Sequence, residues 1–98
     1  MPASTGRLLQ AILASAPQGT LARLDHRHIR RGQVLVSEGA LLDTLYAVET
    51  GRFSAQRAEL RLAEIGTGEA IGEISFLTGE PATADVVAMR DSVVLALN

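Results

Sequence analysis

Residues 71–86 of this 98-residue chain read IGEISFLTGEPATADV, and this stretch decides the fold. Its apolar start predicts the end of a strand, and residues 73–77 are long enough for one short helix of little more than a turn. The GEP sequence at 79–81 predicts a tight loop, because glycine and proline are the strongest breakers of regular structure. The apolar residues that follow Asp85 predict another strand.

From Asp25 onward, the chain around this stretch alternates short apolar runs with glycine-containing turns. The runs lie at residues 34–36, 45–48, 60–65, 86–88 and 93–97. Runs of this kind, separated by turns about every dozen residues, are typical of antiparallel sandwiches, barrels and jelly rolls. A parallel α/β sheet would need helical patterns of roughly 10–15 residues between its strands, and the sequence has none there. We therefore expect a mainly β fold, a roll of about eight strands.

Residues 1–19 are expected to form an N-terminal helix and its connector, and residues 20–98 a single β-roll. Apolar residues within 8–14 recur at helical spacing. Gln10 interrupts them, and the run is too short for a signal peptide or a membrane span.

Composition argues against several classes of function. Hydrophobic residues make up 47% of the chain, but aromatic residues make up only 3%. So few aromatic residues cannot form the stacking surface that single-stranded nucleic acid needs. The formal net charge of -2 gives no electrostatic case for binding nucleic acid or an anionic membrane. The absence of cysteine excludes a disulfide scaffold and a thiolate zinc site, and it fits the reducing cytoplasm.

Backbone amides at the start of the predicted short helix and in the following loop could cradle an anion. A carboxylate beside them could accept hydrogen bonds from vicinal sugar hydroxyls. A cyclic phosphodiester would also need a cation, usually an arginine. The glycines of residues 66–72 match neither the dinucleotide-binding fingerprint nor a P-loop.

This stretch resembles the phosphate-binding cassette of the cyclic nucleotide-binding domains found in bacterial transcription regulators, kinase regulatory subunits and gated channels. That cassette reads approximately Phe-Gly-Glu-x-Ala-Leu and, a few residues later, Pro-Arg-x-Ala-Thr; Gly72-Glu73, Ser75 and Pro81 match it. Further matches precede it at residues 31–35, 38–39, 43–48 and 51. The resemblance covers about residues 20–98 and implies a double-stranded β-helix, or jelly roll, with one short helix in the cassette.

The resemblance also implies a set of ligand-binding residues, which are Gly72, Glu73, Ile74, Ser75, Ala82 and Thr83. Glu73 would hold the ribose hydroxyls, and backbone amides at 72–75 and 82–83 would line the phosphate pocket. An equally open alternative is that Glu73 only caps the first turn of the helix.

The family's phosphate-binding arginine is replaced by Ala82. Loss of a buried charged partner costs about 2–5 kcal/mol, so we expect weak or absent binding of cAMP and cGMP, and no cofactor. Arg52 or Arg57, on the neighbouring hairpin, could substitute from another direction, although exposed strand arginines are usually only solvated.

One feature of the sequence favours an enzymatic function. His26 and His28 would lie on the same face of a strand, as a pair of metal ligands can. The chain has no third histidine, and Glu38, the next glutamate, lies beyond a turn. We therefore expect these histidines to be solvated and the chain to be non-catalytic.

The expected function is that of a regulatory domain in a larger protein, where ligand binding shifts a conformational equilibrium. Family members continue into one or two helices after the last strand, whereas this sequence stops at Asn98. Apolar surface that such helices would cover could promote self-association. The alternative is a ligand-free interaction module that packs on an effector domain. The 88–93 ending and the 79–81 loop resemble modules fused to bacterial patatin-type lipid esterases and transporters.

Overall fold

The computed structural model describes residues 25–72, 75 and 78–97, and this part of the chain contains eight strands. The strands are β1 (Asp25–Ile29), β2 (Val34–Val36), β3 (Leu45–Thr50), β4 (Arg52–Arg57), β5 (Leu60–Gly66), β6 (Ala70–Ile71), β7 (Asp85–Ala88) and β8 (Ser92–Leu97).

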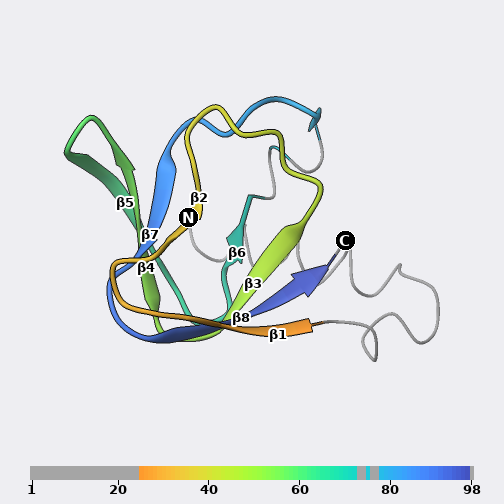
Figure 1. Ribbon diagram of the computed structural model, residues 1–98, viewed down its shortest axis with the longest axis vertical. Coiled ribbons are helices and arrows are strands. Elements are labelled where there is room, and N and C mark those ends of the chain that lie inside the picture. The colour runs from red at the N-terminus through yellow and green to blue at the C-terminus, as the bar shows by residue number, and fades with distance from the viewer. Residues whose placement is uncertain (1–24, 73–74, 76–77, 98) are drawn as a thin grey trace.

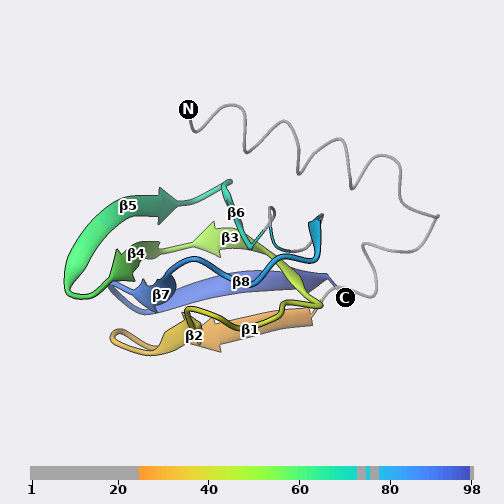
Figure 2. The ribbon, with the colours of Figure 1, turned by 90° about the horizontal axis from the view of Figure 1, so that it is seen from above.

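The strands form two four-stranded sheets, in the orders β1-β8-β3-β6 and β2-β7-β4-β5 (Figure 1). All of the strand pairs are antiparallel. Successive strands belong to opposite sheets, with the exception of the β4–β5 hairpin. This alternation is the winding of a jelly roll, so the predicted fold class is confirmed. Figure 2 shows β1, β8 and β3 running beside one another in the first sheet.

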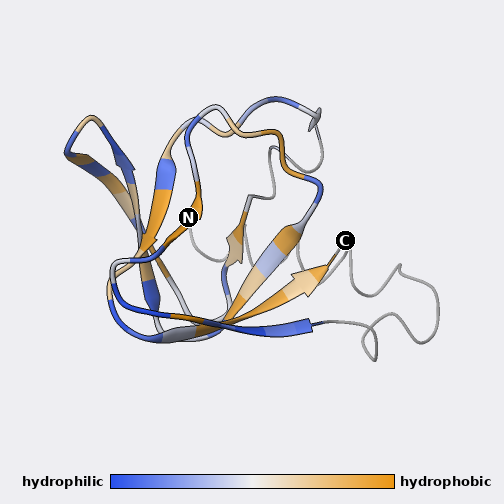
Figure 3. Cartoon of the chain, viewed as in Figure 1, coloured by the Kyte–Doolittle hydropathy of each residue, from blue (hydrophilic) through white to orange (hydrophobic). Residues whose placement is uncertain are grey.

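The core lies between the two sheets and is built mainly from aliphatic side chains. Phe53 and Val94 are completely buried in it, and Ile71 and Val48 are nearly so, whereas Leu45 is buried in a separate, smaller cluster. Strand β8 alternates buried and half-buried positions along its length, as a strand with one face on the core must. In Figure 3 this strand is apolar, whereas β1 at the edge of the same sheet is polar.

The β4–β5 hairpin extends away from the other sheet at the left of Figure 1. Its outer strand, β5, is exposed over most of its length, and Leu60 and Leu62 remain 64% and 45% exposed. The two-residue turn consists of Ala58 and Glu59, both with positive φ (50° and 69°). A positive φ is unfavourable for most residues, and glycine, asparagine and aspartate tolerate it best.

The apolar runs predicted from the sequence correspond to strands β2, β3, β5, β7 and β8. The hairpin that carries Arg52 and Arg57 is formed by β4 and β5. The expected N-terminal helix lies outside the described residues, as does most of the expected cassette helix at 73–77. Within the described ranges, no helix is both long enough and apolar enough to cross a membrane.

Candidate ligand-binding site

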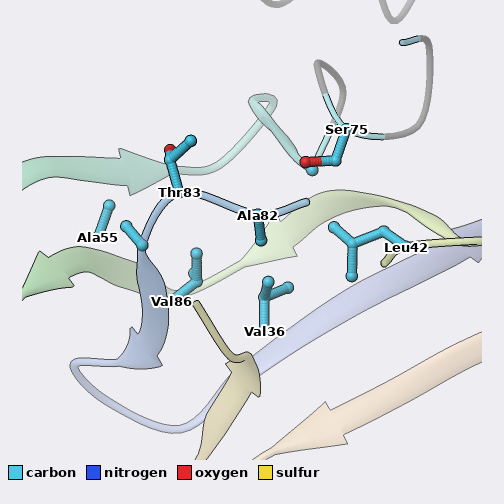
Figure 4. A pocket seen from close by; sticks show the side chains of 9 residues that line it. Val36, Leu42, Ala55, Ser75, Ala82, Thr83 and Val86 are labelled. Atoms are coloured by element: carbon cyan, nitrogen blue, oxygen red, sulfur yellow. The ribbon is translucent and has the colours of Figure 1, made fainter. Parts of the chain in front are cut away.

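A cavity of about 200 Å³ opens where the second sheet meets the two loops that precede β3 and β7. Figure 4 shows its lining side chains, which come from strands β2, β4 and β7 and from the loops. The lining residues are Val36, Leu42, Ala55, Gly72, Ser75, Ala82, Thr83, Ala84 and Val86.

Four of the six residues expected from the sequence therefore border one cavity: Gly72, Ser75, Ala82 and Thr83. Glu73 and Ile74 lie outside the described residues. The apolar lining from Val36, Leu42 and Ala55 carries no motif in the sequence. It becomes recognisable only when the sheet brings β2 and β4 to opposite sides of β7.

Gly72 directly follows β6, borders the cavity and has a positive φ of 83°. A Cβ atom at this position would come within 2.8 Å of Leu42 Cδ1, closer than packed carbon atoms approach. The positive φ thus favours glycine at this position, and an added Cβ would displace the end of the Leu42 side chain. Ser75 follows at the cavity wall, only 9% exposed, and its carbonyl accepts a hydrogen bond from Gly79 N at 2.9 Å.

Ala82 is fixed from both sides by the loop that follows β2. Its carbonyl accepts a hydrogen bond from Gly39 N at 2.7 Å, and its amide donates to the Ala40 carbonyl at 2.8 Å. The Ala82 amide, expected from the sequence to face an anion, is therefore engaged within the protein. What Ala82 presents to the cavity is its methyl group, at the position where the family cassette has arginine.

Arg57 and Arg52, the two alternative cations named from the sequence, have different surroundings. Arg57 Nε donates to the Thr83 carbonyl at 2.9 Å, so this guanidinium lies at the rim of the cavity. Arg52 Nε instead donates to Glu64 Oε1 at 2.6 Å, and Arg61 Nη1 lies 3.2 Å from the other oxygen of that carboxylate. The hydrogen bond from Arg52 is the main reason that the pKa of Glu64 lies below its ordinary value. Arg52 thus pairs with Glu64 on the hairpin and does not line the cavity.

An outer depression adjoins the cavity and shares Ala82 and Thr83 with it. Arg57, Glu38 and Glu80 contribute its charged groups, and Gly39 and Pro81 complete its lining. Asp85, at the start of β7, has a structural role, because its Oδ1 accepts a hydrogen bond from Glu38 N at 2.7 Å.

The two histidines are exposed on β1 and lie apart from this cavity. His26 Nε2 is 3.6 Å from Glu49 Oε2. Among the residues that can be described, no three His, Cys, Asp or Glu side chains are grouped so that they could hold a metal ion.

Comparison with known proteins agrees with this geometry. The sequence pattern of the cyclic nucleotide-binding domain matches residues 26–98. An uncharacterized NTE family protein of Mycobacterium tuberculosis is 36% identical over 88 residues, which is 85% of this chain and 15% of that protein. Lysophospholipase NTE1 of Lodderomyces elongisporus is 38% identical over 79 residues, which is 70% of this chain and 6% of that protein. The chain thus spans only a small part of these relatives.

Solved structures show the same fold. The catabolite activator protein of Thermus thermophilus is 32% identical and superposes with a TM-score of 0.71, covering 85% of this chain and 43% of that one. The regulatory domain of Toxoplasma gondii PKA, solved with cAMP, superposes with a TM-score of 0.77 at 21% identity, covering 96% of this chain and 40% of that one. With its jelly-roll winding and the matched sequence pattern, the chain belongs to the cyclic nucleotide-binding domain family.

Proposed function

We propose that this domain is a regulatory module of a longer protein, and that it binds a cyclic nucleotide or a related small organic phosphate in the cavity beside β7. The observation that carries the proposal is the single cavity bordered by Gly72, Ser75, Ala82 and Thr83. These residues come from both halves of the cassette, at the two ends of the segment that joins β6 to β7. Glu73 and Ile74 remain part of the proposed site, with Glu73 as the ribose partner.

The size and lining of the cavity suggest which part of the ligand it takes. Its volume of about 200 Å³ is below the roughly 300–1,000 Å³ of pockets that enclose a whole drug-sized ligand. We therefore assign the ribose and phosphate to the cavity and leave the base near its open side.

The proposed affinity for cAMP and cGMP is low. At the position of the family's arginine, the cavity has only the methyl group of Ala82, which is 8% exposed. Removal of such a charged partner costs about 2–5 kcal/mol, which corresponds to tens- to thousands-fold in affinity.

The proposed effector is a lipid-ester hydrolase in the same polypeptide. This part of the proposal rests on relatives named as an NTE family protein and as a lysophospholipase, of which this domain matches only a small portion. The domain itself has no proposed catalytic role. Its cytoplasmic location stays a prediction.

An interaction module without a ligand is the second candidate, and one observation favours it. Leu41, Leu60 and Leu62 are exposed by 75%, 64% and 45%, which is apolar surface that a neighbouring domain could cover. In that case the cavity would be a remnant of the family fold.

Titration of the 98-residue chain with cAMP and cGMP, followed by NMR and calorimetry, tests the proposal. The wild type should bind weakly, and Ala82→Arg should bind at least about tenfold more tightly, because the new guanidinium would enter the cavity. Thr67→Arg is the matched control, since it adds the same charge at an exposed position in the turn after β5, which lines neither this cavity nor the outer depression. If neither the wild type nor Ala82→Arg binds either nucleotide, the result contradicts ligand binding and favours a function as an interaction module.

A further inference from the structure

Arg57 is the last residue of β4, and its position relative to the cavity follows from the strand geometry. Ala55, two residues earlier, lines the cavity, and side chains two apart on a strand lie on the same face. In Figure 4, Ala55 and Thr83 lie at one side of the cavity, and Ser75 and Leu42 lie at the other. The guanidinium of Arg57 reaches the Thr83 backbone and is held there by the hydrogen bond of 2.9 Å.

Within the described part of the chain, no carboxylate lies within ion-pair distance of the Arg57 guanidinium. Its neighbours on the hairpin differ in this respect, because Arg52 and Arg61 share Glu64. A guanidinium carries five N–H donors in a planar fork, and the Thr83 carbonyl accepts one of them. Arg57 is therefore both positioned beside the cavity and able to donate further hydrogen bonds to an anion.

We infer that Arg57 is the anion-recognising residue of this domain, replacing from β4 the cation that Ala82 no longer supplies. The inference rests on the proposed function and deepens it. The ligand's phosphate would lie at the rim of the cavity beside Thr83, where the N–H groups of Arg57 that the Thr83 carbonyl does not use can reach it.

The surroundings of Arg57 also define the charge of the ligand. Glu38 and Glu80 line the same outer depression as Arg57. A bound anion would therefore lie near one positive and two negative side chains. A phosphodiester carries a single negative charge, whereas a phosphomonoester carries about -1.5 to -2 at pH 7. Because each added negative charge is repelled by both carboxylates, the site selects monoanionic phosphodiesters over dianionic phosphomonoesters.

Binding of cAMP and 5′-AMP to the full 98-residue chain, measured by NMR titration, tests both parts of this inference. Arg57→Ala should weaken binding of cAMP by about tenfold or more. Arg61→Ala is the matched control. It removes an equal charge from the same hairpin, but its side chain pairs with Glu64 and does not line the depression. Its effect should stay below about threefold, as expected for long-range attraction alone.

Each substitution is also made in the Ala82→Arg background, so that weak binding by the wild type does not prevent the comparison. Unchanged thermal unfolding midpoints show that the variants are folded. Equal affinities of Arg57→Ala and its parent in both backgrounds would overturn the inference while leaving the proposed function intact. Absence of binding by every protein, including Ala82→Arg, would instead remove the proposed function itself.

The charge selection has its own readout. The wild type, or the Ala82→Arg background, should prefer cAMP over 5′-AMP, and replacing both carboxylates (Glu38→Gln with Glu80→Gln) should reduce this preference severalfold by improving the binding of 5′-AMP. An unchanged preference in that double variant would show that the two carboxylates do not select the ligand's charge.

Discussion

At the scale of single residues, Gly51 has the least space for a side chain among the described glycines. It lies between β3 and β4 with φ of 108°, and a Cβ atom there would overlap the Ser92 side chain and come within 2.7 Å of Ser92 Cα. Ser92 cannot move away easily, because its Oγ accepts a hydrogen bond from Arg52 N and donates one to the Arg90 carbonyl.

Gly51→Ala should therefore lower the free energy of unfolding by about 3 kcal/mol or more, through the combined cost of backbone strain and overlap. Chemical denaturation measures this loss. Gly39→Ala is the control, because Gly39 has a similar φ of 86° but open space around it. It should cost only about 1–2 kcal/mol. Equal losses in the two variants would contradict the role of Ser92.

Glu64 provides a residue-scale prediction about pH. Hydrogen bonds and charge from Arg52 and Arg61 lower its pKa in the folded chain. A lowered folded pKa stabilises the native state fully above the ordinary carboxyl pKa, and this contribution disappears as the pH falls through the folded pKa. In denaturation series at decreasing pH, the wild type should thus lose its advantage over Glu64→Gln. The effect is expected to be small, since the carboxylate is largely solvated. A constant difference across this pH range would contradict the assignment.

The candidate site could be predicted from the sequence only where a local motif marks it. Gly72, Ser75, Ala82 and Thr83 belong to one recognisable cassette, and all four border the cavity. Val36, Leu42 and Ala55 could not be found in this way, because each looks like an ordinary core residue. The hydrogen bond of Arg57 to the Thr83 carbonyl joins residues 26 positions apart and has no sequence signature.

At the scale of elements, the β4–β5 hairpin contains a turn whose residues do not suit its backbone. Ala58 and Glu59 both adopt positive φ in a two-residue loop between the paired residues Arg57 and Leu60. Such loops favour Asn-Gly, which tolerates this conformation with little strain.

Replacing Ala58 with Asn and Glu59 with Gly should raise the free energy of unfolding by about 1 kcal/mol. Thermal and chemical denaturation would measure the gain. Ala63→Gly, in the middle of β5, should instead destabilise the chain, because glycine within a strand only adds flexibility to the unfolded state. If the turn variant is no more stable than the wild type, the two positive φ angles carry little strain.

Five of the eight described strands were predictable, because short apolar runs bounded by turns are typical of strands. Their pairing was not, because irregularities shift the register between Val34 and Val36, between Val48 and Thr50, and between Ala55 and Gln56. An alternating pattern indicates which face is buried, but it does not reveal an extra residue that bends the strand.

At the scale of the whole molecule, the sheet orders predict how stability is distributed. Strands β8 and β3 are interior in one sheet, and β7 and β4 are interior in the other, whereas β5 is an exposed edge. Amide hydrogen exchange followed by NMR should therefore be slowest in the interior strands and much faster in β5. Protection of the β5 amides equal to that of β7 would indicate that another surface covers this edge.

Run length, turn spacing and family resemblance predicted the fold class. They did not predict the order in which the strands pair within each sheet. Nothing in the sequence of β1 states that its partner is β8, because this pairing joins opposite ends of the roll. Long-range pairing of this kind depends on the complete set of packed strands rather than on any local pattern.

The pairing of β1 with β8 has a mechanical consequence for a module within a longer polypeptide. Asp25 lies opposite Ala96, so the first and last strands of the roll leave it at adjacent points. Tension applied by flanking domains would open this antiparallel ladder one rung after another, starting at Asp25, instead of loading all of its hydrogen bonds together. The polar strand β1 would detach first. The remainder of the roll, including the cavity beside β7, would stay folded until β1 had separated from β8.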